Sequence, residues 1–183
     1  MKILAVSDSH NGYTFGGFLD KTKTADIVVH LGDGDRDKAD LAAVLMHKRA
    51  EHLTVLTDRF LPDTAADVGS LMHNVPFYAL RGNCDFSGLP EVIFQAGEFN
   101  VLALHGDRFF VKSDLSYLRR YAENKNADIV LYGHSHIPSI DWLDGRLFVN
   151  PGSLCRPRDG YKPTYCVIDI YGDKIYPELK EYK

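Results

Sequence analysis

Carboxylate, amide and imidazole side chains follow five short apolar segments of this sequence. The first two are Asp8 and His10, directly after the aliphatic run 2–7. Side chains two residues apart lie on the same side of an extended chain, so both would point the same way. Four later apolar runs are followed by the other candidates: Asp33, Asn83, His105, His134 and His136. Because ligands collect at the carboxyl ends of strands in open α/β sheets, these side chains are expected to converge.

The number of candidate donors indicates two divalent ions rather than one. Asp-x-His alone is more often part of a polar loop, but five strand endings of this kind are hard to obtain by chance. A single ion rarely needs seven side chains, whereas two ions that share a carboxylate do. Asp33 lies between the first pair and the later donors, so it is the natural bridge. Nitrogen and oxygen donors suit Mn²⁺, our first expectation, and also Fe²⁺, Co²⁺, Ni²⁺ or Zn²⁺.

Alternating strands and helices must position these donors. Apolar and β-branched runs predict strands at 2–7, 26–31, 77–81, 91–94, 100–104, 128–132, 139–143, 146–149, 164–170 and 174–179. Apolar residues at helical spacing predict one helix from Phe15, a second that begins near Lys38 and a third that begins near Asp114. A helix is plausible at 65–72, and 53–56 fits either a strand or a helix. The pattern predicts a layered α/β protein with mixed sheets, and 183 residues form most simply one domain, 1–183.

Composition excludes some classes of function. A formal net charge of −4 argues weakly against a broad nucleic-acid-binding face. No apolar stretch reaches the ~18 residues of a membrane span, and no secretory signal precedes the first strand. Three cysteines form an odd set without metal-finger spacing, so a reduced, cytoplasmic setting is expected. The oligomeric state stays open.

The order Asp-x-His, Gly-Asp, Gly-Asn, His-Gly and Gly-His-x-His resembles that of the calcineurin-like metallophosphoesterases. The segment 150–153, Asn-Pro-Gly-Ser, and the small size are similar to the compact bacterial and archaeal phosphodiesterases. The resemblance spans Ile3 to about Arg158 and implies a four-layer αββα sandwich, in which two mixed sheets pack face to face between helices. It also implies two metal sites, one formed by Asp8, His10, Asp33 and His136, the other by Asp33, Asn83, His105 and His134.

The expected function is hydrolysis of small phosphoesters, above all phosphodiesters. Two cations roughly 3.5–4 Å apart clamp a phosphoryl group and bring the pKa of a bound water to roughly 7, so a metal-bound hydroxide is the expected nucleophile. The alternative is a non-catalytic metal-binding scaffold or protein-interaction subunit, because relatives resembling the retromer component use the fold in that way. Competent donors at all seven positions favour the enzyme.

Two positions depart from the family pattern. The family commonly has a histidine, which assists the leaving group, where this chain has Cys84. A thiol is not an equivalent proton donor at neutral pH, so good leaving groups and diesters should be preferred, and Cys84→His should help poor leaving groups if Asp85 orients the imidazole. Asp107, often histidine in relatives, either orients a ligand or is a solvated loop charge.

Other candidates lie outside the donor series. Arg156 and Arg158 are expected in a loop on the active rim, where each either grips a phosphate oxygen or is solvated. His30 lies inside a predicted strand and is read as a core histidine. The remaining histidines, His47, His52 and His73, are read as surface residues.

Overall fold

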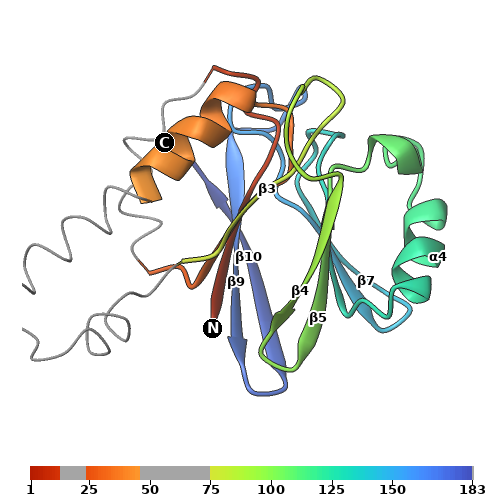
Figure 1. Ribbon diagram of the computed structural model, residues 1–183. Helices are drawn as coiled ribbons and strands as arrows, with labels where there is room; N and C mark the ends of the chain where they lie inside the picture. Colours follow the sequence, from red (N-terminus) through yellow and green to blue (C-terminus); the bar gives the residue numbers. More distant parts are fainter. Residues whose placement is uncertain (13–23, 46–74, 183) are drawn as a thin grey trace, which may run out of the picture.

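The computed structural model describes residues 1–12, 24–45 and 75–182, and ten strands in these ranges form two five-stranded sheets (Figure 1). The first sheet has the order β10 (Lys174–Glu181), β9 (Thr164–Tyr171), β1 (Lys2–Val6), β2 (Ile27–His30) and β3 (Phe77–Ala79). The second has the order β4 (Glu91–Ala96), β5 (Phe99–Leu104), β6 (Ile129–Leu131), β8 (Arg146–Asn150) and β7 (Ser139–Leu143). Both sheets contain parallel and antiparallel pairs.

Alternation of apolar side chains along the strands builds the four layers. Ile3 and Ala5 of β1 and Val101 of β5 belong to one buried cluster between the sheets. The intervening side chains of β1, such as Leu4, pack on the opposite face with Leu41 of the helix at 35–45. Both faces of these strands are therefore buried, which explains their continuous aliphatic sequences.

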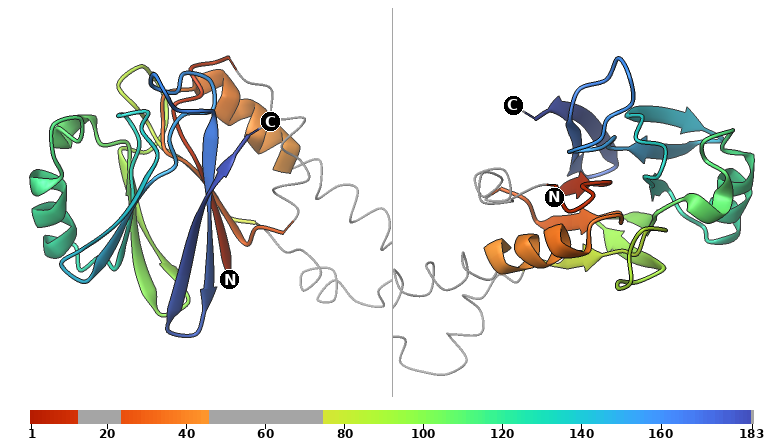
Figure 2. Two further views of the ribbon diagram at one scale, coloured as in Figure 1. Left: turned by 180° about the vertical axis from the view of Figure 1, so that it is seen from behind. Right: turned by 90° about the horizontal axis from the view of Figure 1, so that it is seen from above.

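The second sheet is covered in the same way. Leu102 and Val130 pack with Leu118 of α4 (Ser116–Asn124). The view from above in Figure 2 shows the helix at 35–45 and α4 on the two outer faces of the sandwich. The expected αββα arrangement is confirmed.

The predicted strands are all present, and the differences lie at element ends. The first described helix begins at residue 35, three residues before Lys38, because the chain turns at Gly32 and Asp33 and the Lys38 amide already bonds to the Gly34 carbonyl. The hairpin strands β4 and β5 each extend closer to the turn at Gly97 than expected. The expectations for Phe15, 53–56, 65–72 and the three surface histidines fall outside the described residues.

The carboxyl ends of β1, β2 and β3 meet at one edge, because the three strands are parallel neighbours. β5, β6 and β8 are likewise parallel, and the turn η2 (Asp107–Phe109) follows β5 at the same edge, at the top of Figure 1. Within the described ranges, no helix has the length and apolarity needed to cross a membrane.

Candidate metal centre

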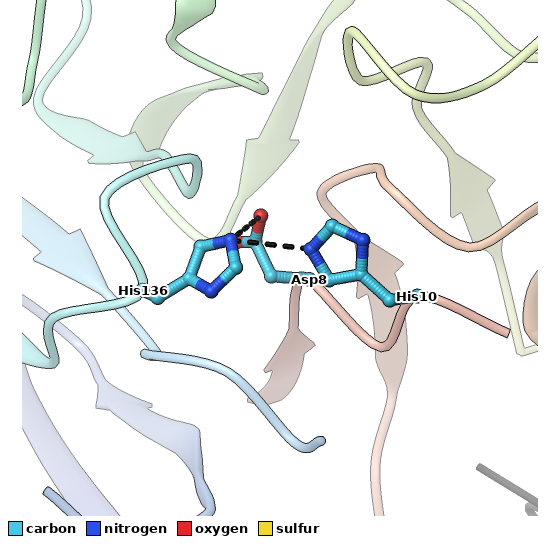
Figure 3. A group of neighbouring side chains, drawn as sticks. All are labelled: Asp8, His10 and His136. Atoms are coloured by element: carbon cyan, nitrogen blue, oxygen red, sulfur yellow. Dashed lines mark hydrogen bonds and ion pairs between the residues drawn. The ribbon is translucent and has the colours of Figure 1, made fainter. Parts of the chain in front are cut away.

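Five of the seven predicted ligands form a continuous set of close contacts at this edge. Asp8 Oδ1 lies 3.3 Å from His136 Nε2, which lies 3.2 Å from His10 Nε2 (Figure 3). Asp33 Oδ2 then lies 3.9 Å from His10 Nε2 on one side and 3.6 Å from His105 Nε2 on the other. The Asp33 carboxylate therefore stands between two groups of imidazoles, which is the position that a bridging ligand requires.

The other two predicted ligands lie around this set. The His134 ring packs edge-on against His105 with centroids 5.1 Å apart, and its backbone N–H donates to Asp8 Oδ2 at 3.0 Å. Asn83 is exposed, and its amide donates to Cys84 Sγ at 3.3 Å. Asn83 joins His105 only in lining a neighbouring cavity, so the structure does not bring it into the contact set.

Two buried atoms in the set that could coordinate a metal ion lack hydrogen bonds. Asp8 is fully buried and His105 is nearly so, yet neither Asp8 Oδ1 nor His105 Nε2 has a hydrogen-bond partner among the described residues. Such atoms are rare in folded proteins, because an unpaired buried polar group is costly. His105 Nδ1 donates to the Leu31 carbonyl and His136 Nδ1 to the Arg156 carbonyl, so each ring turns its Nε2 lone pair inward. This donor set fits divalent cations.

Backbone conformation also marks the predicted ligands. Asp8, His10, Asp33, His134 and His136 have φ values of 53°, 49°, 59°, 67° and 60°. This left-handed region is unfavourable for residues with a Cβ, and such strain persists where the surrounding structure imposes it. A tight approach accompanies it, because a Cβ on Gly82 would lie 2.0 Å from Asp33 Oδ1. The loops are therefore shaped to present side chains at one point.

The ionisation of the cluster suits metal binding. Burial lowers the pKa of His10 and of His134, so both imidazoles are neutral at neutral pH. Burial by itself raises the pKa of Asp8, but the contact with the His136 imidazole and the hydrogen bond from Ser7 are among the interactions that outweigh it, and the net pKa lies below its ordinary value. The same contact with Asp8 raises the pKa of His136. The neutral imidazoles of His10 and His134 and the ionised carboxylate of Asp8 are in the forms that bind cations, whereas at His136 a cation would compete with a proton.

A buried ion pair below the cluster was missed by the sequence analysis. The Asp85 carboxylate accepts the backbone N–H groups of Asp33 at 2.6 Å, Gly34 at 2.7 Å and Gly82 at 2.9 Å. Lys38 Nζ donates to the same carboxylate at 2.9 Å, and the Lys38 side chain is only 5% exposed. Lys38 lies on the same helix face as Leu41, three residues further on. This position on the inward face was the sequence feature that could have predicted a buried lysine.

This pair bears on the expectation that Asp85 orients an imidazole at position 84, which stays a prediction. Asp85 Oδ2 accepts three of the hydrogen bonds above and Oδ1 accepts one, so Oδ1 is the atom that could still accept a donor such as an imidazole at position 84. Cys84 itself is exposed, and its Sγ lies within 4.8 Å of donor atoms of His10 and Asp33. Partial burial and then the hydrogen bond and charge of Asp33 raise the pKa of the thiol, which is neutral at pH 7.

The two predicted phosphate-binding arginines take different positions. Arg158 Nε donates to the Ser135 carbonyl at 3.2 Å and lines a cavity of about 340 Å³ together with Lys112. Arg156 holds His136 through its backbone carbonyl, and its charge acts on His10. The charge of Asp107 acts on His134, but no hydrogen bond joins its side chain to a predicted ligand within the described residues.

His30 is the core histidine that its position in a strand predicts. Its Nε2 lies 2.9 Å from Ser9 Oγ, and its Nδ1 accepts the Gly32 N–H. Burial lowers the pKa of His30 to about 3, so the ring is neutral. Its role is to support the strand-to-loop turns from within.

Two mixed sheets between helices, with carboxylates and imidazoles gathered at the strand ends, define a metal-binding αββα protein. Residues 35–173 match the calcineurin-like phosphoesterase superfamily domain, and the chain belongs to this family. A probable metallophosphoesterase of Mycoplasma pneumoniae is 28% identical over 178 residues, which cover 95% of this chain and 92% of that protein. The probable metallophosphoesterase YsnB of Bacillus subtilis is 35% identical over 100 residues, covering 54% of this chain but only 59% of YsnB.

Solved structures show the same fold. Vacuolar protein sorting 29 from Cryptosporidium parvum aligns with a TM-score of 0.70 at 18% identity, covering 100% of this chain and 91% of that one. An archaeal phosphodiesterase aligns with a TM-score of 0.62 at 18% identity, covering 98% and 100%. At these identities the likeness concerns the fold alone.

Removing the buried ammonium tests the role of the ion pair. We expect Lys38→Met to lower the free energy of unfolding by about 3–5 kcal/mol, because it leaves the Asp85 charge buried without its partner. Lys125→Met is the matched control: Lys125 bonds Glu91 at the same 2.9 Å but is 33% exposed, so its loss should change stability by less than about 1 kcal/mol. Urea denaturation in EDTA measures both, and equal effects would contradict the assignment.

The pH dependence of stability provides a second check. Burial by itself raises the pKa of Asp85. Hydrogen bonds from the Gly82 amide, Lys38 and the Gly34 amide together lower it by more, so the net pKa lies below 3.8. The stabilisation is therefore complete above the unfolded pKa and is lost as pH falls from about 5 towards 3. Asp85→Asn removes this proton linkage, so its unfolding free energy in EDTA should vary less over that range. An unchanged slope would show that other carboxylates carry the linkage.

Proposed function

We propose that this protein is a phosphodiesterase that works with two divalent ions on small phosphodiesters. In this proposal Asp8, His10, Asp33 and His136 hold one ion, and Asp33, Asn83, His105 and His134 hold the other, with Mn²⁺ the first choice. Asn83 would have to turn inward from its exposed position. The observation that carries the proposal is the Asp33 carboxylate between His10 and His105, beside buried donor atoms without hydrogen bonds.

The described residues prepare the site for phosphoryl transfer. Bound ions supply the positive charge that polarises a phosphoryl group and the acidity that activates a water. The Leu31 and Arg156 carbonyls fix the rings of His105 and His136, so their lone pairs are directed before any ligand arrives. The Arg156 guanidinium adds positive charge on the side of His10, which favours an anionic substrate.

The surroundings of Cys84 support a preference for activated diesters. Its thiol is neutral but a weak hydrogen-bond donor, and the lowered pKa of Asp85 keeps that carboxylate ionised, so neither group is suited to protonate a departing alkoxide. A leaving group that is stable as an anion needs no such proton. A diester also carries one negative charge fewer than a monoester dianion, which eases attack by an anionic nucleophile.

Two further expectations accompany this proposal. Three cysteines without disulfide partners, one of them exposed, support a reducing cytoplasmic location.

A non-catalytic scaffold is the second candidate function, and the resemblance in fold to vacuolar protein sorting 29 is the observation in its favour. Turnover of a phosphodiester with added Mn²⁺ separates the two, because a scaffold would bind metal without turnover.

Asp33→Asn tests the bridge. An amide has one coordinating oxygen and no charge, so we expect metal content to fall from two ions to at most one per chain. Turnover of bis(p-nitrophenyl) phosphate should fall by roughly 10²-fold or more, since metal charge stabilisation is worth several kcal/mol. Asp173→Asn, in the exposed hairpin turn, is the control and should change neither quantity. Two bound ions with near-normal turnover in Asp33→Asn would defeat the assignment.

A leaving-group series tests the missing proton donor. General acid catalysis is worth roughly 10²–10⁴-fold, so wild-type rates on aryl and alkyl diesters should fall steeply as the leaving-group pKa rises. Cys84→Ala should follow the same line within about threefold, because the thiol contributes no proton. A shallow dependence in the wild type that becomes steep in Cys84→Ala would identify the thiol as the donor instead.

A further inference from the structure

A cavity of about 530 Å³ opens beside the candidate metal centre. It lies between the loop that follows β3, the η2 turn and α4, and its lining includes both Asn83 and His105. Small-molecule sites typically have volumes of roughly 300–1,000 Å³, so this space accepts far more than one phosphoryl group. Because His105 belongs to the lining, the cavity is within reach of a substituent of a substrate bound there.

The carboxylates of the lining are mostly neutralised. Asp85 is paired with Lys38, as described above. Glu91 accepts hydrogen bonds from Tyr121 Oη at 2.7 Å and from Lys125 Nζ at 2.9 Å. Asp107 is the remaining acidic residue of the lining. The anionic side of the cavity therefore amounts to one unpaired carboxylate.

Two arginines of the same lining keep their donors available. Across residues 1–12, 24–45 and 75–182, neither Arg81 nor Arg108 makes a side-chain hydrogen bond or an ion pair within 4.0 Å. Arg108 does act on Glu91 through its charge, but Glu91 is already bonded to Lys125. Arginine is the side chain best suited to bind phosphate or carboxylate through two parallel hydrogen bonds.

An aromatic wall completes the cavity. Phe109 and Tyr121 both line it, and their ring centroids are 4.8 Å apart. This wall offers apolar contact to a sugar or ring, while the arginines offer charge to a more distant group.

We propose that this cavity binds a second anionic group of the substrate, through Arg81 and Arg108. The substrate class is then small phosphodiesters whose organic part carries an additional phosphate or carboxylate. This inference rests on the proposed phosphodiesterase function and specifies its substrate.

Two diesters with the same leaving group test it. Thymidine 5′-(p-nitrophenyl phosphate) and its 3′-phosphorylated counterpart both release p-nitrophenol, and only the second offers a further phosphate. Wild-type protein with Mn²⁺ should show a kcat/KM about tenfold higher for the phosphorylated compound, and Arg81→Gln/Arg108→Gln should bring this ratio close to one. Arg120→Gln, an exposed arginine of α4 outside the lining, should keep the wild-type ratio and so controls for net charge.

Equilibrium binding gives a readout that needs no turnover. In EDTA, calorimetry should show thymidine 3′,5′-bisphosphate binding at least about fivefold more tightly than thymidine 5′-monophosphate to the wild type and to Arg120→Gln, and equally to the double variant.

The outcomes separate the two proposals. Equal kcat/KM for both diesters, or a high ratio retained in the double variant, overturns the anion subsite and leaves the phosphodiesterase assignment standing. Hydrolysis of neither diester overturns that assignment instead. The calorimetric ratios then decide the subsite alone, and equal wild-type affinities overturn it.

Discussion

The hydrogen bonds accepted by the Asp85 carboxylate are the interactions on which the site depends most. The carboxylate joins the amides of Asp33 and Gly34, after β2, to that of Gly82, after β3. Two separate loops thereby acquire one fixed geometry. The charge is tolerated below the surface only because Lys38 neutralises it from the helix at 35–45. This pair therefore ties that helix to the loops that follow β2 and β3 and to the backbone of Asp33.

The other predicted ligands at this edge of the sheets carry free-energy costs of burial and backbone strain, which a bound metal ion would offset. Asp8 Oδ1 and His105 Nε2 are buried without hydrogen bonds and face only other predicted ligands, and five predicted ligands hold left-handed backbone conformations. Packing on both faces of the sheets overdetermines these loops, so the strain persists in the folded chain. Cation binding would satisfy the unpaired donors, which means that ligand affinity and folding stability are linked in this protein.

The two proposals give the surroundings of the centre different roles. Among the described residues, neither Cys84 nor Asp85 is a strong proton donor, which would restrict the leaving groups in the proposed reaction. Arg81 and Arg108 offer uncommitted positive charge next to an aromatic wall. If both proposals hold, specificity would come from these flanks, and the predicted metal ligands would provide the hydrolysis.

From the sequence by itself, the layers could be predicted, and so could the convergence of five of the seven candidate side chains at one edge. Continuous aliphatic runs such as 2–7 predict strands buried on both faces, and a polar side chain at the end of each run predicts where ligands lie. These are local patterns with a period or a position that can be counted. The family follows from their order along the chain.

Only the tertiary structure decided which polar groups meet. Asp85 and Lys38 are 47 residues apart, and nothing local distinguishes their buried pair from two solvated charges. The same holds for Asn83, which its motif places with the ligands but which lies exposed, and for Arg81 and Arg108, whose shared cavity the sequence analysis did not foresee. Pairing, burial and charge neutralisation depend on how the loops of two sheets pack together, and that packing has no signature in the spacing of residues along the chain.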